Sequence, residues 1–359
     1  MDGEDGVSAP AAPPPHPKSR SAARLALRRG PTIDQVAAEA GVSRGTVSRF
    51  LNGGHYVSPR AQAAIESAVE RMGYVANQSA RSLVTKRSNA FAFVLPESQE
   101  RLFEDPNFAV LMRECTDRLA QSDRTLVLMV ADTASSSRRV LQWVQGGHVD
   151  GVLLVSAHQG NPLVDALLRQ GVPAVAAGRP LGHEDSIPYV SADDRQGARQ
   201  MTEHLFDRGR ERVAIIAGPA DTPGGVDRLR GYRDVVDQHG AEPLVAVASA
   251  YSGLAGEAAM DRLLEQCPDL DGVFAASDLL AVGALSALRR SGRTVPDDVA
   301  LGGFDDSQLA EHADPPLTTV RQPMREVGSR MVEMILAQVR GETVESQILG
   351  TSLIVRSST

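Results

Sequence analysis

The chain has 359 residues, and 42% of them are hydrophobic, which is enough for two or three globular domains. No apolar run approaches the roughly 20 residues that span a membrane, and the first thirty residues lack the apolar core of a signal peptide. Two cysteines far apart in sequence and eight scattered histidines form no metal or redox motif. We therefore expect a cytoplasmic protein with no membrane partner, no metal and no cofactor.

Charge divides the chain into two unequal parts. Residues 1–88 contain 12 Lys and Arg against 7 Asp and Glu, a balance of +5. The whole chain carries −8, so residues 89–359 carry −13. A basic end on an acidic body predicts that only the N-terminal end meets nucleic acid. Residues 1–30 are rich in Ala and Pro and are expected to be a disordered tail, either dispensable or in non-specific contact with DNA backbone.

Residues 31–75 are predicted to form a helix-turn-helix DNA-binding domain. Ile33 and Ala37 share one face of a first short helix. That helix ends at Gly41, because glycine adopts a positive φ at little cost. Ser43 can then cap a second helix. Two short helices joined by a glycine turn allow the second one to enter the major groove.

The exposed face of the second helix suits the major groove. Arginine side chains can read guanine edges, while hydroxyl and amide groups can hold phosphates. The alternative is a solvated helix face that carries two arginines. The groove-facing positions are Ser43, Arg44, Gly45, Thr46, Ser48, Arg49 and Asn52.

A third helix is expected from about residue 58 to residue 72, since Ser58 can cap it and Pro59 suits its first position. Residues 76–88 follow as a hinge segment and linker. Within them, residues 77–83 have helical propensity over only about two turns. A helix this short is marginal in water and needs a partner to fold.

Four stretches, GVSRGTVSRFLN, HYVS, GYVANQSARSL and PPLTTVRQP, resemble the LacI/GalR family of bacterial transcription regulators. The similarity runs from about residue 32 to the C-terminus. It implies a repressor that binds a palindromic operator in double-stranded DNA as a homodimer. It also implies a hinge helix that folds on DNA and wedges Leu83 into the minor groove; by itself, Leu83 reads as an ordinary core leucine. The further DNA contacts implied are Thr32, Tyr56, Asn77, Ala80 and Leu83.

From residue 89 the pattern changes to short apolar runs separated by stretches long enough for a helix, as in parallel sheets covered on both faces. There are too many of these strand–helix units to form a single sheet. The predicted fold class is therefore an N-terminal all-α helix-turn-helix domain followed by an α/β core of two lobes. The resemblance implies that this core is periplasmic-binding-protein-like. The expected strands are residues 90–95, 125–130, 151–155, 172–177, 213–218, 272–277 and 299–304.

The resemblance also implies three crossings of the chain between the lobes of the core, residues 89–359. The expected crossings lie near residues 189–191, 317–323 and 341–346. The expected N-lobe comprises about residues 89–190 and 320–341, and the expected C-lobe about residues 191–319 and 342–356.

Ligands of open parallel sheets bind beyond the carboxyl ends of the strands. The resemblance implies a small-molecule effector in the cleft between the lobes, a sugar as the first expectation and a nucleoside as the second. Effector binding would set the orientation of the lobes and thereby the spacing of two hinge helices. The candidate effector-binding residues are Phe108, Arg228, Ser277, Asp305 and Gln322.

Several of these candidates have a structural alternative. Arg228 and Asp305 can form an ion pair across the cleft, and Phe108 can be a plain core residue. Asp278 is expected to cap the helix that follows it. Gly-Arg at 178–179 stands where many relatives have an aspartate, so one acceptor for a ligand hydroxyl is missing.

Two other classes of protein fit the sequence less well. The chain has no GxSxG, no P-loop and no GxGxxG opening a helix, so we expect no enzyme. A free solute-binding protein would not carry the N-terminal helices. The remaining alternative is a ligand-independent DNA-binding protein with a vestigial solute-binding core.

Replacing Leu83 with Ala is expected to weaken specific operator binding while leaving salt-dependent, non-specific binding nearly intact, because a minor-groove wedge acts only on the bent specific site. Fluorescence anisotropy on specific and random duplexes at fixed salt measures both. Equal losses on the two duplexes would contradict the wedge.

Overall fold

The computed structural model describes residues 31–51, 57–74 and 87–359. The chain divides into two compact units, Met1–Thr85 and Lys86–Thr359, which are described separately. The expected tail and almost all of the expected hinge segment lie outside the described residues. Among the described residues, no helix has the length and apolarity that a membrane crossing requires.

The first unit contains the three predicted helices, α1 (Ile33–Ala40), α2 (Arg44–Leu51) and α3 (Pro59–Met72). The Thr32 hydroxyl caps α1, and Gly41 ends it at φ 65°, as its position after the apolar stripe predicts. These caps satisfy backbone groups that a helix of eight residues leaves open at its ends. The buried side chains that join the helices are Val36, Ala37, Val47, Ile65 and Ala68.

The N-lobe of the second unit is built on a six-stranded parallel sheet in the order β11-β5-β4-β3-β1-β2. Its strands are β1 (Ala90–Leu95), β2 (Thr125–Val130), β3 (Gly151–Val155), β4 (Ala174–Ala177), β5 (Tyr189–Ala192) and β11 (Gln347–Leu349). Its helices are α5 (Gln99–Glu104), α6 (Pro106–Ala120), α7 (Ala134–Gln145), α8 (Pro162–Gln170) and α14 (Met324–Val339).

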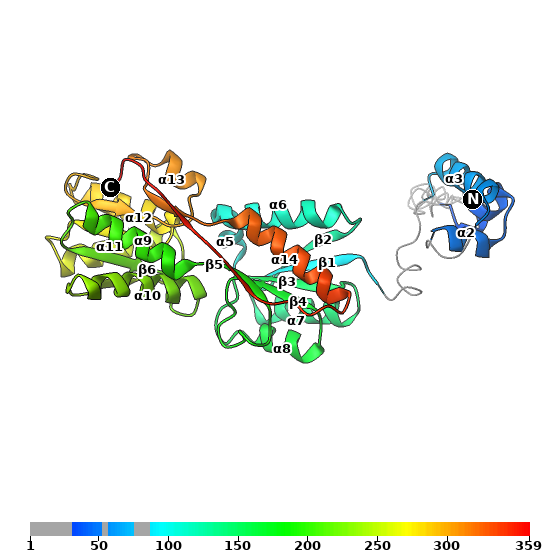
Figure 1. Cartoon of the computed structure of the whole chain (residues 1–359), viewed down its shortest axis with the longest axis horizontal. Helices are drawn as coiled ribbons and strands as arrows, with labels where there is room; N and C mark the ends of the chain where they lie inside the picture. The colour runs from blue at the N-terminus through cyan, green and yellow to red at the C-terminus, as the bar shows by residue number, and fades with distance from the viewer. Residues whose placement is uncertain (1–30, 52–56, 75–86) are drawn as a thin grey trace, which may run out of the picture. The chain divides into compact units, whose positions relative to one another are not determined.

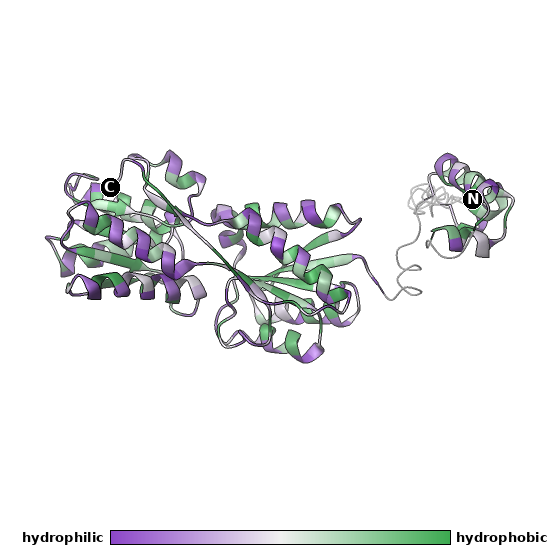
Figure 2. Ribbon diagram, viewed as in Figure 1, coloured by the Kyte–Doolittle hydropathy of each residue, from purple (hydrophilic) through white to green (hydrophobic). Residues whose placement is uncertain are grey.

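Alternate residues of β1 face the two sides of this sheet. Phe91 and Phe93 pack with α6 and α14, whereas Ala92 and Val94 pack with α7 and α8. Both faces are therefore buried, which explains why β1 and β3 read as continuous apolar runs. Figure 2 shows the hydrophobic strands enclosed by helices whose outer faces are hydrophilic.

The C-lobe is built on a four-stranded parallel sheet in the order β7-β6-β8-β9. The strands are β6 (Val213–Ala217), β7 (Leu244–Val247), β8 (Gly272–Ala275) and β9 (Ala300–Gly302), and an antiparallel pair, β10 (Thr319–Arg321) and β12 (Ser352–Ile354), lies beside them. The helices are α9 (Asp194–Asp207), α10 (Pro223–Gln238), α11 (Gly253–Gln266), α12 (Asp278–Arg290) and α13 (Gln308–His312).

The chain passes between the lobes after β5, after β10 and after β11 (Figure 1). The first crossing comes directly after β5, which contains the predicted residues 189–191, and the second follows β10, within the predicted residues 317–323. The third prediction, near residues 341–346, is wrong, and so is the assignment of residues 347–349 to the C-lobe. Strand β11 pairs with β5 and extends the N-lobe sheet, and the chain crosses only after it. A strand of three residues carries too little periodicity to be found in the sequence.

All seven predicted strands are present, although β4, β6, β8 and β9 are shorter than expected. The sequence missed β5, β7, β10, β11 and β12, each of only three or four residues.

Gly231→Ala is expected to destabilise the C-lobe by about 1–3 kcal/mol, because overpacking forces two helices apart. A Cβ at residue 231 of α10 would overlap the carbonyl oxygen of Arg195 and crowd the Cβ of Ala198 on α9. Urea denaturation followed by circular dichroism measures the change. The matched control is Gly253→Ala, where a Cβ meets no atom within 4 Å. A loss in the control as large as that at Gly231 would contradict the packing explanation.

Candidate functional site

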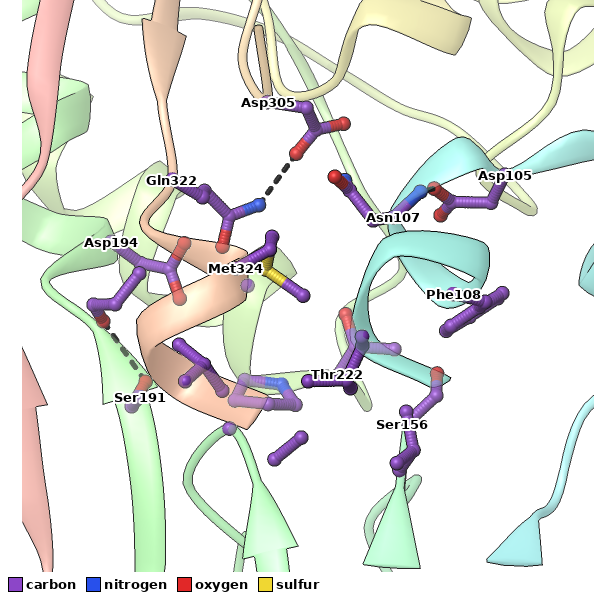
Figure 3. A pocket seen from close by; sticks show the side chains of 18 of the residues that line it. Asp105, Asn107, Phe108, Ser156, Ser191, Asp194, Thr222, Asp305, Gln322 and Met324 are labelled. Carbon is purple, nitrogen blue, oxygen red and sulfur yellow. Dashed lines mark hydrogen bonds between the residues drawn. The ribbon is translucent and has the colours of Figure 1, made fainter. Parts of the chain in front are cut away.

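A cavity opens between the N-lobe and the C-lobe, at the carboxyl ends of both sheets. We call it the central cavity; it holds about 820 Å³ of space free of protein atoms, open solvent at its mouth included. Parallel sheets bring their ligand-binding loops to this edge. Figure 3 shows polar side chains from both lobes around it. All five predicted residues line it: Phe108, Arg228, Ser277, Asp305 and Gln322.

Among these side chains, Arg228 is buried and fixed by several polar contacts. It lies on α10 with 6% of its surface exposed. Its Nε and Nη2 each lie 2.8 Å from Oδ1 of Asp194, and its Nη1 donates to the Ala276 carbonyl at 2.6 Å. Its guanidinium also lies 3.8 Å from the centroid of the Phe304 ring. Burial by itself would lower the pKa of Arg228, but the Asp194 carboxylate raises it, so the cation is permanent.

Asp305 follows β9 with a backbone φ of 122°, a conformation that L residues rarely adopt. Its Oδ1 accepts a hydrogen bond from Nε2 of Gln322 at 2.6 Å and lies 3.7 Å from Nη1 of Arg228. Burial raises the pKa of Asp305 well above its usual value, although Arg228 opposes the shift. Arg228 and Asp305 do form an ion pair, but both belong to the C-lobe, so the pair does not span the cleft as the structural alternative supposed.

Phe108 on α6 is both a core residue and a lining residue. It is 6% exposed and packs in the core between α6, α14 and the N-lobe sheet, yet it also borders the central cavity. Beside it, Asp105 caps α6 by accepting the Asn107 N–H at 3.0 Å and pairs with Arg101 at 3.0 Å. The Arg101 guanidinium lies 4.9 Å from the ring centroid of Tyr251 in the C-lobe.

Ser277, rather than Asp278, caps α12. The Ser277 hydroxyl accepts the Leu280 N–H at 3.2 Å, so it keeps only its hydrogen and one lone pair for a ligand. The Asp278 carboxylate instead accepts the Thr319 hydroxyl at 2.6 Å and the Ser307 N–H at 2.8 Å. Asp278 therefore ties α12 to β10 and to the loop before α13, and the prediction that it caps its helix is wrong.

Two sets of charged contacts join the lobes outside the central cavity. His158, after β3, lies 3.1 Å from a carboxylate oxygen of Glu97 and 2.8 Å from one of Asp221 in the C-lobe. Arg179, after β4, binds both carboxylate oxygens of Asp227 on α10, at 2.7 and 2.6 Å. The sequence suggested that Gly178 and Arg179 replace an acceptor for a ligand hydroxyl. In the structure, Arg179 instead forms a contact between the lobes.

Sequence reasoning missed the other lining residues, among them the polar side chains of Arg101, Asp105, Asp194, Thr222 and Tyr251. Asp105 carried a usable signal, because Asp before Pro commonly caps a helix. Asp194 follows β5, which is too short to be predicted. Within the described residues, no group of three or more His, Cys, Asp or Glu side chains could hold a metal ion.

The predicted DNA-contacting residues that are described lie at the start of α1 and along α2. Ser43 caps α2 by accepting the Thr46 N–H at 3.1 Å, and Arg49 donates to the Gly45 carbonyl at 3.2 Å. Ser43, Arg44, Gly45 and Arg49 are exposed, Thr46 and Ser48 are half-buried, and Thr32 is exposed at the cap of α1. Outside the described residues lie Asn52, Tyr56, Asn77, Ala80 and Leu83.

Comparison with known proteins agrees with this architecture. Residues 32–77 match the family described as bacterial regulatory proteins, lacI family, and residues 202–359 match the periplasmic binding protein-like domain. The chain is 44% identical over 337 residues to the HTH-type transcriptional regulator CelR of Thermobifida fusca, which covers 92% of this chain and 99% of that protein. The chain belongs to the LacI family of bacterial regulatory proteins. It is an HTH-type transcriptional regulator, and the predicted fold class is confirmed.

Other members of the LacI family are similar over nearly the same length. The ribose operon repressor of Halalkalibacterium halodurans is 33% identical, covering 91% of this chain and 97% of that protein. A solved transcriptional regulator CelR–cellobiose complex has a TM-score of 0.74 at 42% identity, covering 92% of this chain and all of the other. The lac repressor dimer bound to operator and the anti-inducer ONPF has a TM-score of 0.82 at 24% identity, covering 92% and 99%, which shows the common fold.

His158 is expected to make the stability of this LacI-family core depend on pH. Its hydrogen bond to Glu97 raises its pKa to about 9; burial opposes the shift and Asp221 supports it. Because the folded-state pKa lies above the usual 6.5, the stabilisation by the imidazolium is complete below about pH 6.5 and is lost as pH rises through about 9. His158→Gln should therefore lower Tm at pH 6 and flatten the decline of Tm between pH 6.5 and 9.5.

Differential scanning fluorimetry across this pH range makes the measurement. His312→Gln, at an exposed position, is the matched control and should keep the wild-type decline. A decline that survives in His158→Gln would mean that other groups produce it.

Proposed function

We propose that this LacI-family regulator binds a neutral sugar in its central cavity and that the sugar changes its affinity for a palindromic operator. The observation that carries the proposal is the pairing of the cavity's charges. Of its lining cations, Arg101 pairs with Asp105 and Glu97, and Arg228 pairs with Asp194. An anionic ligand would find no cation among these that lacks a carboxylate partner, whereas a neutral polyol meets no such penalty.

The cavity also offers hydrogen-bonding groups that suit hydroxyls. The carboxyl groups of Asp105, Asp194 and Asp305 offer acceptor oxygens, and the amide of Gln322 has a second N–H and a carbonyl to offer. Because Gln322 lies in the second crossing, a ligand that contacts it touches the segment about which the lobes move.

Apolar surfaces complete the match to a sugar. Phe108 and Met324 line the same cavity as these carboxylates (Figure 3). A pyranose ring has apolar C–H faces and polar edges, so it can pack on such side chains while its hydroxyls reach the acceptors. The solved CelR–cellobiose complex, 42% identical to this chain, makes cellobiose the first sugar to test.

The proposal extends to how the signal reaches DNA. The exposed residues of α2 read each half-site, a homodimer matches the two-fold operator, and the signal passes through the hinge segment and linker, residues 76–88. A sugar that prefers one orientation of the lobes then changes operator affinity, and operator changes sugar affinity by the same factor. Such couplings are typically about 1–3 kcal/mol.

Operator and effector can be tested in one series. Duplexes that bind the full-length protein are selected from a random pool, and anisotropy on the selected duplex is followed during titration with cellobiose. We expect a palindromic duplex and a shift in operator affinity of about fivefold or more with cellobiose. A selected palindrome without any sugar or nucleoside response, together with no ligand-induced rise in Tm, would instead support the ligand-independent alternative.

Arg228→Ala should abolish the sugar response while operator binding without sugar persists. The matched control is Arg233→Ala, an exposed arginine on the same helix, which should respond like the wild type. Because Arg228→Ala leaves buried carboxylates unpaired, its Tm is measured alongside, and retained operator affinity shows that the protein is folded. An intact sugar response in Arg228→Ala would remove Arg228 from the site.

A further inference from the structure

A second cavity adjoins the central one near the first crossing. We call it the outer cavity; residues that line it include Tyr189, Asp193, Arg195 and Arg230. Ser191, Ala192 and Asp194 line both cavities. The two spaces are therefore neighbours that share the end of β5 and the start of α9 as a common border.

The rest of the border comes from one short segment of each lobe. In the N-lobe segment, Gly178 lines the central cavity and its neighbour Arg179 lines the outer cavity. In the C-lobe segment, Arg228 lines the central cavity and its neighbour Asp227 lines the outer one. The contact between Arg179 and Asp227 therefore lines the outer cavity, next in sequence to residues that line the central cavity on both lobes, and we call this border the partition.

This contact is a well-formed ion pair. Two hydrogen bonds run from Nη2 of Arg179 to Asp227, and Nε adds a third contact at 3.2 Å. Arg179 is also held by Glu184 at 3.1 Å, and the two paired side chains are only 24% and 18% exposed. A bidentate, partly buried pair is stronger and more rigid than an exposed surface pair.

The two lobes also lie close together beside the Arg179–Asp227 pair. Gly178 has φ 81°, and a Cβ built there would lie 3.4 Å from Cγ of Pro223 in the C-lobe. A ligand extending past this point would have to separate Arg179 from Asp227. Asp227 would then keep only Arg230, at 3.4 Å and 58% exposed.

We infer that the Arg179–Asp227 pair determines ligand specificity by closing the central cavity on this side, so that the effector is a short saccharide and longer chains are excluded. This inference rests on the proposed sugar effector. Without the pair, the outer cavity becomes continuous with the central one, and a further sugar unit can enter it. The polar side chains of Tyr189, Asp193 and Arg195 would then face its hydroxyls.

The test is calorimetric titration of the full-length protein with glucose, cellobiose, cellotriose and cellotetraose. The wild type is expected to bind cellotetraose at least about tenfold more weakly than cellobiose, or not at all. In Arg179→Ala this difference should shrink to within about threefold, mainly through tighter binding of the longer sugars. Asp227→Asn keeps the size of the side chain and weakens the pair, so it should shift the preference in the same direction and serves where Arg179→Ala folds poorly.

The matched control is Asp221→Ala, which removes the contact between the lobes at His158 but lies outside both cavity linings. It should change the affinity for all bound sugars by one common factor.

The same uniform change in Arg179→Ala and Asp227→Asn would overturn the inference, because the pair would then only hold the lobes together. Wild-type binding of cellotetraose as tight as that of cellobiose would also overturn it, while leaving the sugar effector standing. A wild type that binds none of the four sugars, in the presence or absence of the selected duplex, would overturn the proposed effector and this inference with it.

Discussion

One buried cation, the guanidinium of Arg228, organises the C-lobe side of the cleft. It contacts Asp194 just after the first crossing, the Ala276 carbonyl just after β8, and Asp305 just after β9. Three segments far apart in sequence are thereby fixed around one charge. Removing a partner from such a buried pair typically costs about 3–5 kcal/mol, because the remaining charge is left without compensation. The site is therefore held in place before any ligand arrives.

The N-lobe side of the cleft is lined by an aromatic ring and the capped start of a helix. Phe108 and Asp105 come from the start of α6, where the carboxylate serves as helix cap and as partner of Arg101. Polar groups at strand ends in one lobe thus face an aromatic ring and a capped helix in the other. This combination suits a ligand with hydroxyl edges and apolar faces, and an enclosed, paired set of charges disfavours an anion.

Two charged contacts between the lobes lie outside the lining of the central cavity. His158 and Arg179 reach Asp221 and Asp227 from loops after neighbouring N-lobe strands. A change in lobe orientation must break or form these contacts, so their free energies enter the equilibrium that an effector shifts. The same contacts between the lobes can therefore affect both the preferred lobe orientation and the choice of ligand. Variants of two different contacts have to be compared to separate these effects.

The sequence determined the local structure well. The capped helices of residues 31–75, the long apolar strands and the positions of Ser277 and Asp305 just after strands all follow from short-range patterns, since caps and periodicity act within a few residues. Only the tertiary structure decided where the pairs of charges form. The placement of β11 beside β5, the contact of Arg228 with Asp305, and the Arg179–Asp227 pair depend on contacts between residues tens to hundreds of positions apart. No local pattern encodes such contacts, because they are fixed by how the two sheets and their crossings pack.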